Sequence, residues 1–161
     1  MVSALLALEE TLPGKLQLLV VCGDDERARR RLAKRAEESA MPMQVLGFVE
    51  YMADLMAVSD AIVAKAGGLT VSEALSRGLP LILYHIIPGQ EYMNADYVSR
   101  QGAGVIADGP MEVAQAVRRF LEDPARFETM RKAAKALGRP NAAEAIVLEV
   151  VKPLLRSPTG I

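Results

Sequence analysis

Short apolar runs alternate with longer segments of mixed polarity along the chain. The apolar runs occupy residues 16–22, 43–46, 61–64, 81–84 and 105–106. Runs of this length without polar alternation are typical of strands that are covered on both faces. A helix is expected to begin after a cap at Asp24 or Asp25 and to end at about residue 40. Further helices are expected in residues 2–12, 52–58, 69–77, 91–101, 110–122, 124–137 and 142–155. The pattern predicts an α/β domain, a Rossmann-like parallel sheet with helices on both faces.

The order of these elements is unusual at the start of the chain, where a helix precedes any strand. A doubly wound domain begins with its central strand. We therefore expect the first strand and its glycine-rich loop to lie upstream of Val2, and the chain to be a fragment or excised domain. The domain is expected to span residues 1–155, followed by a tail at 156–161.

Composition excludes several classes of function. The chain has 161 residues, a net charge of −1 and 4% aromatic residues without tryptophan, which argues against a nucleic-acid surface that stacks bases. A single cysteine and a single histidine exclude an internal disulfide and a structural zinc site, and they favour a cytoplasmic setting. No apolar run approaches the roughly 20 residues that a membrane helix needs.

A glycine pair after the third apolar run carries the most informative chemistry. Gly67 and Gly68 let backbone amides approach an anion closely, because no side chain intervenes. The helix that starts near Leu69 adds unpaired N–H groups and the positive end of its dipole. Together these features predict a diphosphate site, although a tight strand-to-helix turn explains the same glycines. The segment is neither a P-loop nor a dinucleotide fingerprint.

Polar residues in the first turns of this helix extend the site. Thr70 or Ser72 could cap the helix or donate a hydroxyl to phosphate. Glu73 could accept both hydroxyls of a ribose, as acidic residues do in dinucleotide folds. The alternative for Glu73 is an ordinary acidic residue that the helix dipole favours.

Two further stretches follow strands and are expected on the same rim of the sheet. Gln90 and Glu91 combine an amide with a carboxylate, which suits sugar hydroxyls, and Asn94 could brace the loop. Phe48 and Val49 could hold a flat pyrimidine. The alternatives are a turn followed by a surface helix at residues 88–92, and a Phe48 that anchors its loop to the core.

Five motifs follow one another in the sequence: Gly-Phe-Val, Lys-Ala-Gly-Gly-Leu-Thr-Val-Ser-Glu-Ala-Leu, Gly-Leu-Pro, Pro-Gly-Gln-Glu-Tyr-Met-Asn-Ala and Gly-Ala-Gly-Val. In this order and spacing they resemble the C-terminal domain of family 28 glycosyltransferases, over about residues 2 to 155. The chain looks most similar to the group of monogalactosyldiacylglycerol synthases and processive diacylglycerol glucosyltransferases. The peptidoglycan N-acetylglucosaminyltransferase that makes lipid II is a more distant relative.

The resemblance implies a GT-B enzyme with two Rossmann-like domains, of which this one holds a UDP-sugar. Its implied contacts are the uracil with Phe48 and Val49, the diphosphate with Gly67, Gly68, Leu69 and Thr70, the ribose with Glu73, and the sugar with Gln90 and Glu91. Gly23 would border the nucleotide pocket, and Lys65 stands where relatives often carry a basic residue or proline. The general base and most of the lipid acceptor site would lie in the N-terminal domain, so no catalytic residue is assigned here.

The resemblance also implies that the full-length enzyme transfers a hexose to a diacylglycerol-type lipid, without a metal or cofactor. The UDP-sugar is its substrate, and contact with the cytoplasmic membrane face would be peripheral. Turnover by this chain alone is not expected, because the chain departs from the family mainly by truncation. The alternatives are a stand-alone nucleotide-sugar-binding subunit of a split glycosyltransferase, a lipid-II-type donor domain, and an epimerase half-domain. The sequence does not distinguish glucose from galactose.

Three other features receive no catalytic role. Cys22 is interpreted as an inert core thiol, and His85 as a loop histidine. A basic helix face could contact anionic lipid, but a solvated surface with ion pairs explains it as well. That face consists of Arg27, Arg30, Arg31 and Lys34.

Overall fold

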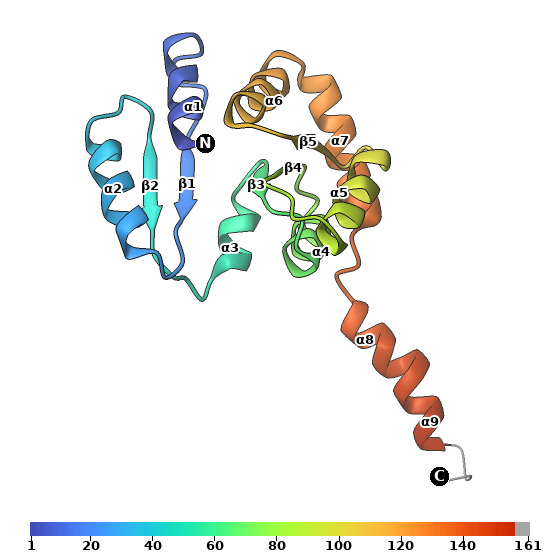
Figure 1. The fold of residues 1–161 in the computed structure, drawn as a ribbon. Coiled ribbons are helices and arrows are strands. Elements are labelled where there is room, and N and C mark those ends of the chain that lie inside the picture. Colours follow the sequence, from blue (N-terminus) through green and yellow to red (C-terminus); the bar gives the residue numbers. More distant parts are fainter. Residues whose placement is uncertain (157–161) are drawn as a thin grey trace.

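A computed structural model describes residues 1–156 (Figure 1). Its strands are β1 (Leu18–Val21), β2 (Met43–Leu46), β3 (Ile62–Ala64), β4 (Leu81–Tyr84) and β5 (Gly104–Ala107). Its helices are α1 (Val2–Leu6), the 3₁₀ turn η1 (Ala7–Glu10), α2 (Glu26–Glu37), α3 (Met52–Ala57), α4 (Gly68–Arg77), α5 (Gln90–Arg100), α6 (Pro110–Glu122), α7 (Pro124–Leu137), α8 (Ala142–Ile146), the π-helical stretch η2 (Val147–Val151) and α9 (Lys152–Arg156). The α/β class predicted from the sequence is confirmed, and most element ends differ by one or two residues.

The strands form two parallel sheets, β1–β2 and β3–β4–β5. Val20 is in register with Val45 in the first sheet, and Leu83 with Ile106 in the second. The pairing is parallel as expected, and within the described residues the strands divide into two sheets because β1 and β3 each pair on one side only. One strand between them would complete the doubly wound order 3-2-1-4-5-6. A first strand upstream of Val2 stays a prediction.

Strand β4 shows why the predicted strands are continuously apolar. Leu81, Ile82 and Leu83 are fully buried. Leu81 and Leu83 belong to a core cluster with residues of α4 and α5, whereas Ile82 belongs to a second cluster with residues of α1 and α6. Successive side chains of a strand point to opposite faces, so a strand covered on both faces needs an apolar residue at every position.

The N-terminal helix is shorter than the sequence predicts. It gives way after Leu6 to the 3₁₀ turn, in which Leu8 packs into the core. Leu5 and Leu8 are buried in the cluster that contains residues of α6. Arg118 of α6 also donates to Thr11 Oγ1 at 2.7 Å. These contacts fix the start of the chain over one face of the three-stranded sheet.

Helix α2 follows the capping pattern that the sequence predicts. Asp25 is its N-cap and accepts the N–H of Ala28 at 2.8 Å. Glu26 forms ion pairs with Arg29 at 2.6 Å and Arg30 at 2.9 Å. These two hydrogen-bonded guanidinium groups lower the pKa of Glu26 to about 2. Arg30 therefore belongs to a solvated, ion-paired surface, and membrane contact by this face stays a prediction.

The C-terminal helical segment differs in character from the rest of the chain. Segments α8, η2 and α9 run on from one another and project away from the sheets (Figure 1). Apolar side chains on them, such as Leu148 and Leu154, are exposed. Of the tail expected at 156–161, residues 157–161 lie outside the described part. No helix in residues 1–156 is long and apolar enough to cross a membrane.

Candidate functional site

The site begins at the start of α4, directly after β3. Gly67 is the N-cap of this ten-residue helix, with φ −63° and ψ 137°, and no side chain caps it. The first intrahelical backbone hydrogen bond is donated by Val71 to the Gly67 carbonyl. The expectation that Thr70 or Ser72 caps the helix is therefore wrong, because both lie inside it rather than before it. The leading N–H groups of α4 remain available to a ligand.

The surroundings of Gly67 and Gly68 distinguish a diphosphate site from a tight strand-to-helix turn that needs glycine. An added Cβ at Gly67 would meet nothing within 4 Å, and one at Gly68 would meet only Asn94 Nδ2 at 3.9 Å. Neither residue has the positive φ that favours glycine. Packing and backbone conformation within the protein thus do not require glycine here. An external group that approaches the backbone closely does explain both residues.

Asn94 connects the glycine loop to α5. Its Nδ2 donates to the Ala66 carbonyl at 2.9 Å, across 28 residues of sequence. Ala66 is fully buried and Asn94 partly buried, so this bond fixes the loop before α4 relative to α5. The bracing role expected for Asn94 is what the structure shows.

The start of α5 lies beyond the carboxyl end of the neighbouring strand, β4. Gly89 precedes the helix with φ 110°, a conformation open almost only to glycine. The Glu91 carboxylate accepts the N–H of Ile87 at 3.0 Å, so one of its oxygens holds the loop. Gln90 is exposed at the first helical position. Gln90 therefore has the freer side chain of the two predicted sugar ligands.

Phe48 and Val49 lie in the loop after β2, in the other sheet. Phe48 is 70% exposed, which rules out the interpretation that it anchors the loop to the core. Gly23 follows β1 with φ 56°, and its carbonyl lies 3.7 Å from an ideal Cβ at Gly47. The loops after β1 and β2 are thus adjacent. Helix α3, which follows Phe48, packs against α4.

The remaining predicted residues lie at the solvent-facing side of α4. Glu73 is exposed on the helix, and Lys65 is exposed just before the glycine loop. Leu69 is 82% exposed, although it is apolar. None of these three side chains belongs to the described core, and ligand contact by each of them stays a prediction.

A hollow that the sequence does not predict lies beside this site. A cavity of about 880 Å³ lies between the loops after β4 and β5 and includes Gln90, His85, Met93 and Asp108. His85 has φ 58°, an uncommon conformation for a residue other than glycine. The loop after β5 was the available signal, since all parallel strands end on the same rim. No group of three potential metal ligands occurs within residues 1–156.

Cys22 lies at the end of β1, one residue before Gly23, and is partly buried. Burial raises the pKa of its thiol, and the negative charge of Asp25 acts in the same direction. The reactive thiolate is therefore scarce at neutral pH and increases only at higher pH. We expect alkylation by iodoacetamide at pH 7.5 to be slower than that of glutathione.

The matched variant for this expectation is Asp25→Asn. Asparagine retains the N-cap of α2 but removes the negative charge, so alkylation of Cys22 should become faster. Alkylation of the parent protein as fast as that of glutathione would contradict the raised pKa.

Comparisons with known proteins identify relatives that cover most of the chain. A processive diacylglycerol beta-glucosyltransferase of Bacillus cereus (strain AH187) is 38% identical over 132 residues, which cover 82% of this chain and 34% of that protein. The protein of the same name from Bacillus subtilis (strain 168) is 33% identical over 138 residues, covering 86% and 36%. The chain thus spans about a third of the length of these relatives.

A solved structure shares the fold. The crystal structure of WaaG, a glycosyltransferase involved in lipopolysaccharide biosynthesis, superposes with a TM-score of 0.69 at 18% identity, over 97% of this chain and 42% of that one. The sequence model of the glycosyltransferase family 28 C-terminal domain matches residues 1–146. Because this model matches most of the chain and both relatives are similar over 82% or more of it, the chain belongs to the glycosyltransferase family 28 C-terminal domain family.

Proposed function

We propose that this chain binds a UDP-sugar and forms the donor domain of a glycosyltransferase. The observation that carries the proposal is the start of α4, where two glycines with open surroundings precede an uncapped helix. Unpaired N–H groups and the positive end of the helix dipole together favour a diphosphate. The same groups would stabilise the UDP that departs during transfer, because the negative charge develops where the amides already point.

The other contacts of the proposed UDP-sugar follow from the positions of the side chains. Thr70, Leu69 and the glycine amides would surround the diphosphate, and Glu73 would accept the ribose hydroxyls. Exposed Phe48, with Val49, would cover the uracil. Gln90 and the free oxygen of Glu91 would bind the sugar, with Asn94 fixing the loop between the two helix starts. Gly23 and Lys65 would border the pocket.

Calorimetric titration with UDP tests the proposal, with ADP as the control nucleotide. Selective binding of UDP supports a uridine site. Binding of neither nucleotide, or equal binding of both, contradicts it. Comparison of the affinities for UDP-glucose and UDP-galactose then identifies the sugar. We propose glucose, because both Bacillus relatives are named glucosyltransferases.

The Glu73→Ala variant tests the ribose contact. We expect UDP to bind more weakly by about 1.5–3 kcal/mol, because hydrogen bonds to a charged acceptor contribute about that much. Glu38→Ala, at an exposed position after α2, is the matched control and should leave the affinity unchanged. Unchanged UDP affinity in Glu73→Ala would remove this residue from the site.

For the whole protein, we propose transfer of glucose to a diacylglycerol-type lipid at the cytoplasmic membrane face. The names of the relatives support this acceptor. The product of the complete reading frame that contains this chain should transfer radiolabelled glucose from UDP-glucose to dioleoylglycerol in vesicles. Transfer to another acceptor only, or none, would contradict the lipid assignment while leaving the donor site to its own test.

A further inference from the structure

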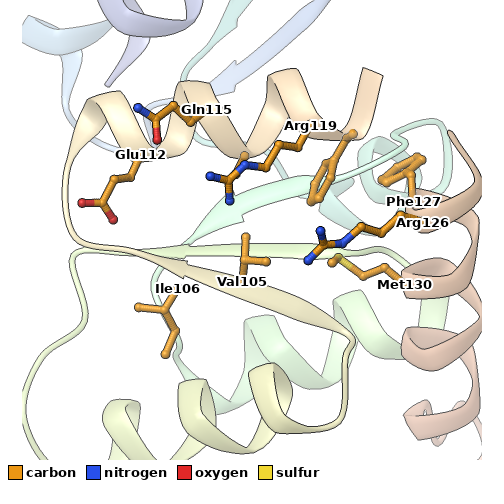
Figure 2. Close-up of a pocket in the computed structure, with 10 residues that line it drawn as sticks. Val105, Ile106, Glu112, Gln115, Arg119, Arg126, Phe127 and Met130 are labelled. Carbon is orange, nitrogen blue, oxygen red and sulfur yellow. The ribbon is translucent and has the colours of Figure 1, made fainter. Parts of the chain in front are cut away.

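A second cavity lies at the other side of β5, between that strand and helices α6 and α7 (Figure 2). Its volume is about 330 Å³, at the lower end of the range for small-molecule pockets. None of the residues assigned above to the UDP-sugar lines it. The cavity is thus separate from the proposed donor site.

Two arginines give the cavity its charge. Figure 2 shows Arg119 of α6 and Arg126 of α7 extending their guanidinium groups over Val105 of β5. Neither guanidinium forms an ion pair or hydrogen bond within residues 1–156. By contrast, the neighbouring Arg118 and Arg131 pair with Glu122 and Glu128, each at 3.6 Å. The two positive charges of the cavity are therefore available to a ligand.

The only carboxylate at the cavity among the described residues is already engaged. Glu112 accepts the N–H of Asp108 at 3.0 Å, which holds the loop before α6. It does not neutralise either arginine, because no ion pair joins them. The net charge of the cavity lining is positive, with two guanidinium groups against one carboxylate.

Apart from Gln115, the remaining side chains of the lining are apolar. The rings of Phe120 and Phe127 lie against each other with centroids 4.8 Å apart. Met130 is 8% exposed, and Val105 and Ile106 form the strand side of the cavity. An apolar group placed here would be stabilised because its surface is removed from water.

We propose that this cavity binds a small amphipathic anion, a single carboxylate or phosphate monoester carried on an alkyl or aryl group. Guanidinium groups bind such anions through charge-assisted, often bidentate hydrogen bonds. The pair of phenylalanine rings and Met130 would receive the apolar part. Both parts are needed, because either arginines alone or an apolar wall alone would select a different ligand class.

Titration calorimetry with three probes tests the two parts separately. Octyl phosphate below its aggregation concentration carries both parts, inorganic phosphate only the anion, and octanol only the chain. We expect octyl phosphate to bind at least about tenfold more tightly than either of the others, since a hydrogen bond to a charged group contributes roughly 1.5 kcal/mol or more. Equal binding of octyl phosphate and octanol, or of octyl phosphate and phosphate, overturns the proposal, as does no binding.

Variants locate the binding. Arg119→Gln and Arg126→Gln should each weaken octyl phosphate at least about tenfold. Arg131→Gln, on α7 outside the cavity lining, is the matched control and should have no effect. Circular dichroism and UDP affinity should be unchanged in all three, which separates this site from folding and from the donor site. Octyl phosphate binding that survives the double variant Arg119→Gln/Arg126→Gln overturns the assignment.

Discussion

Replacing both Gly67 and Gly68 by alanine is expected to weaken UDP binding at least about tenfold without loss of stability. The backbone of Gly67, with φ −63° and ψ 137°, is open to alanine, and its added Cβ would meet no atom within 4 Å. The Cβ at Gly68 would meet only Asn94 Nδ2 at 3.9 Å. Alanine at such positions stabilises a fold by about 0.4–1 kcal/mol, through the unfolded state. The new methyl groups would instead stand where the diphosphate approaches the amides.

Thermal unfolding and UDP calorimetry of the same preparations measure the two effects. Gly109→Ala is the matched control: Gly109 is also the N-cap of a helix, α6, and an added Cβ there meets nothing within 4 Å. It should leave the UDP affinity unchanged and, by the same argument, should not lower the melting temperature. Full UDP affinity in the double variant would mean that the diphosphate binds elsewhere. A lower melting temperature would mean that the glycines serve the fold.

Gly104→Ala is expected to have the opposite profile, with a loss of about 3 kcal/mol in the free energy of unfolding. An ideal Cβ at Gly104 would lie 2.5 Å from the Leu81 carbonyl oxygen and 2.9 Å from Val98 Cγ1. Gly104 pairs with Leu81 at the start of β4 and β5, and all three residues are buried. The backbone oxygen cannot move without disturbing β4, so the strands must separate.

Urea and thermal denaturation measure this loss. For a domain of this size we expect the melting temperature to fall by about 6–12 °C. Gly109→Ala, five residues along the chain, again provides the comparison at an open position. If the Gly104→Ala variant has the same melting temperature as the parent protein, β5 moves away from β4 at little cost. The close approach of the two strands is then not a constraint on the sheet.

Local patterns account for the parts of the fold that the sequence predicted well. The strands at residues 43–46 and 81–84 have the bounds that the sequence predicts, because each is a short, mostly apolar run that directly follows a proline. Pro110 and Pro124 set the starts of α6 and α7 for a similar reason, since proline is favoured in the first helical turn. The 3₁₀ turn after Leu6 was missed, because it depends on how Leu8 packs against the core.

Local sequence patterns do not predict contacts between residues that are far apart in the chain. The division into two sheets depends on which strand edges meet, and period-two patterns do not encode the partner of a strand. Glu91 was predicted as a sugar ligand, yet the structure shows that it first holds the N–H of Ile87. Such a bond depends on the path of the loop, which the sequence does not specify.

The α/β class, the family motifs and the glycine pair before α4 can be recognised in the sequence, since these depend on residue types at short spacing. The open surroundings of Gly67 and Gly68, and the bond from Asn94 to Ala66 across 28 residues, emerge only from the folded arrangement. It also brought Arg119 and Arg126 to one cavity. The physical reason is that burial, open space and unpaired charge are properties of packed elements, and packing joins residues whose separation in the chain carries no signal.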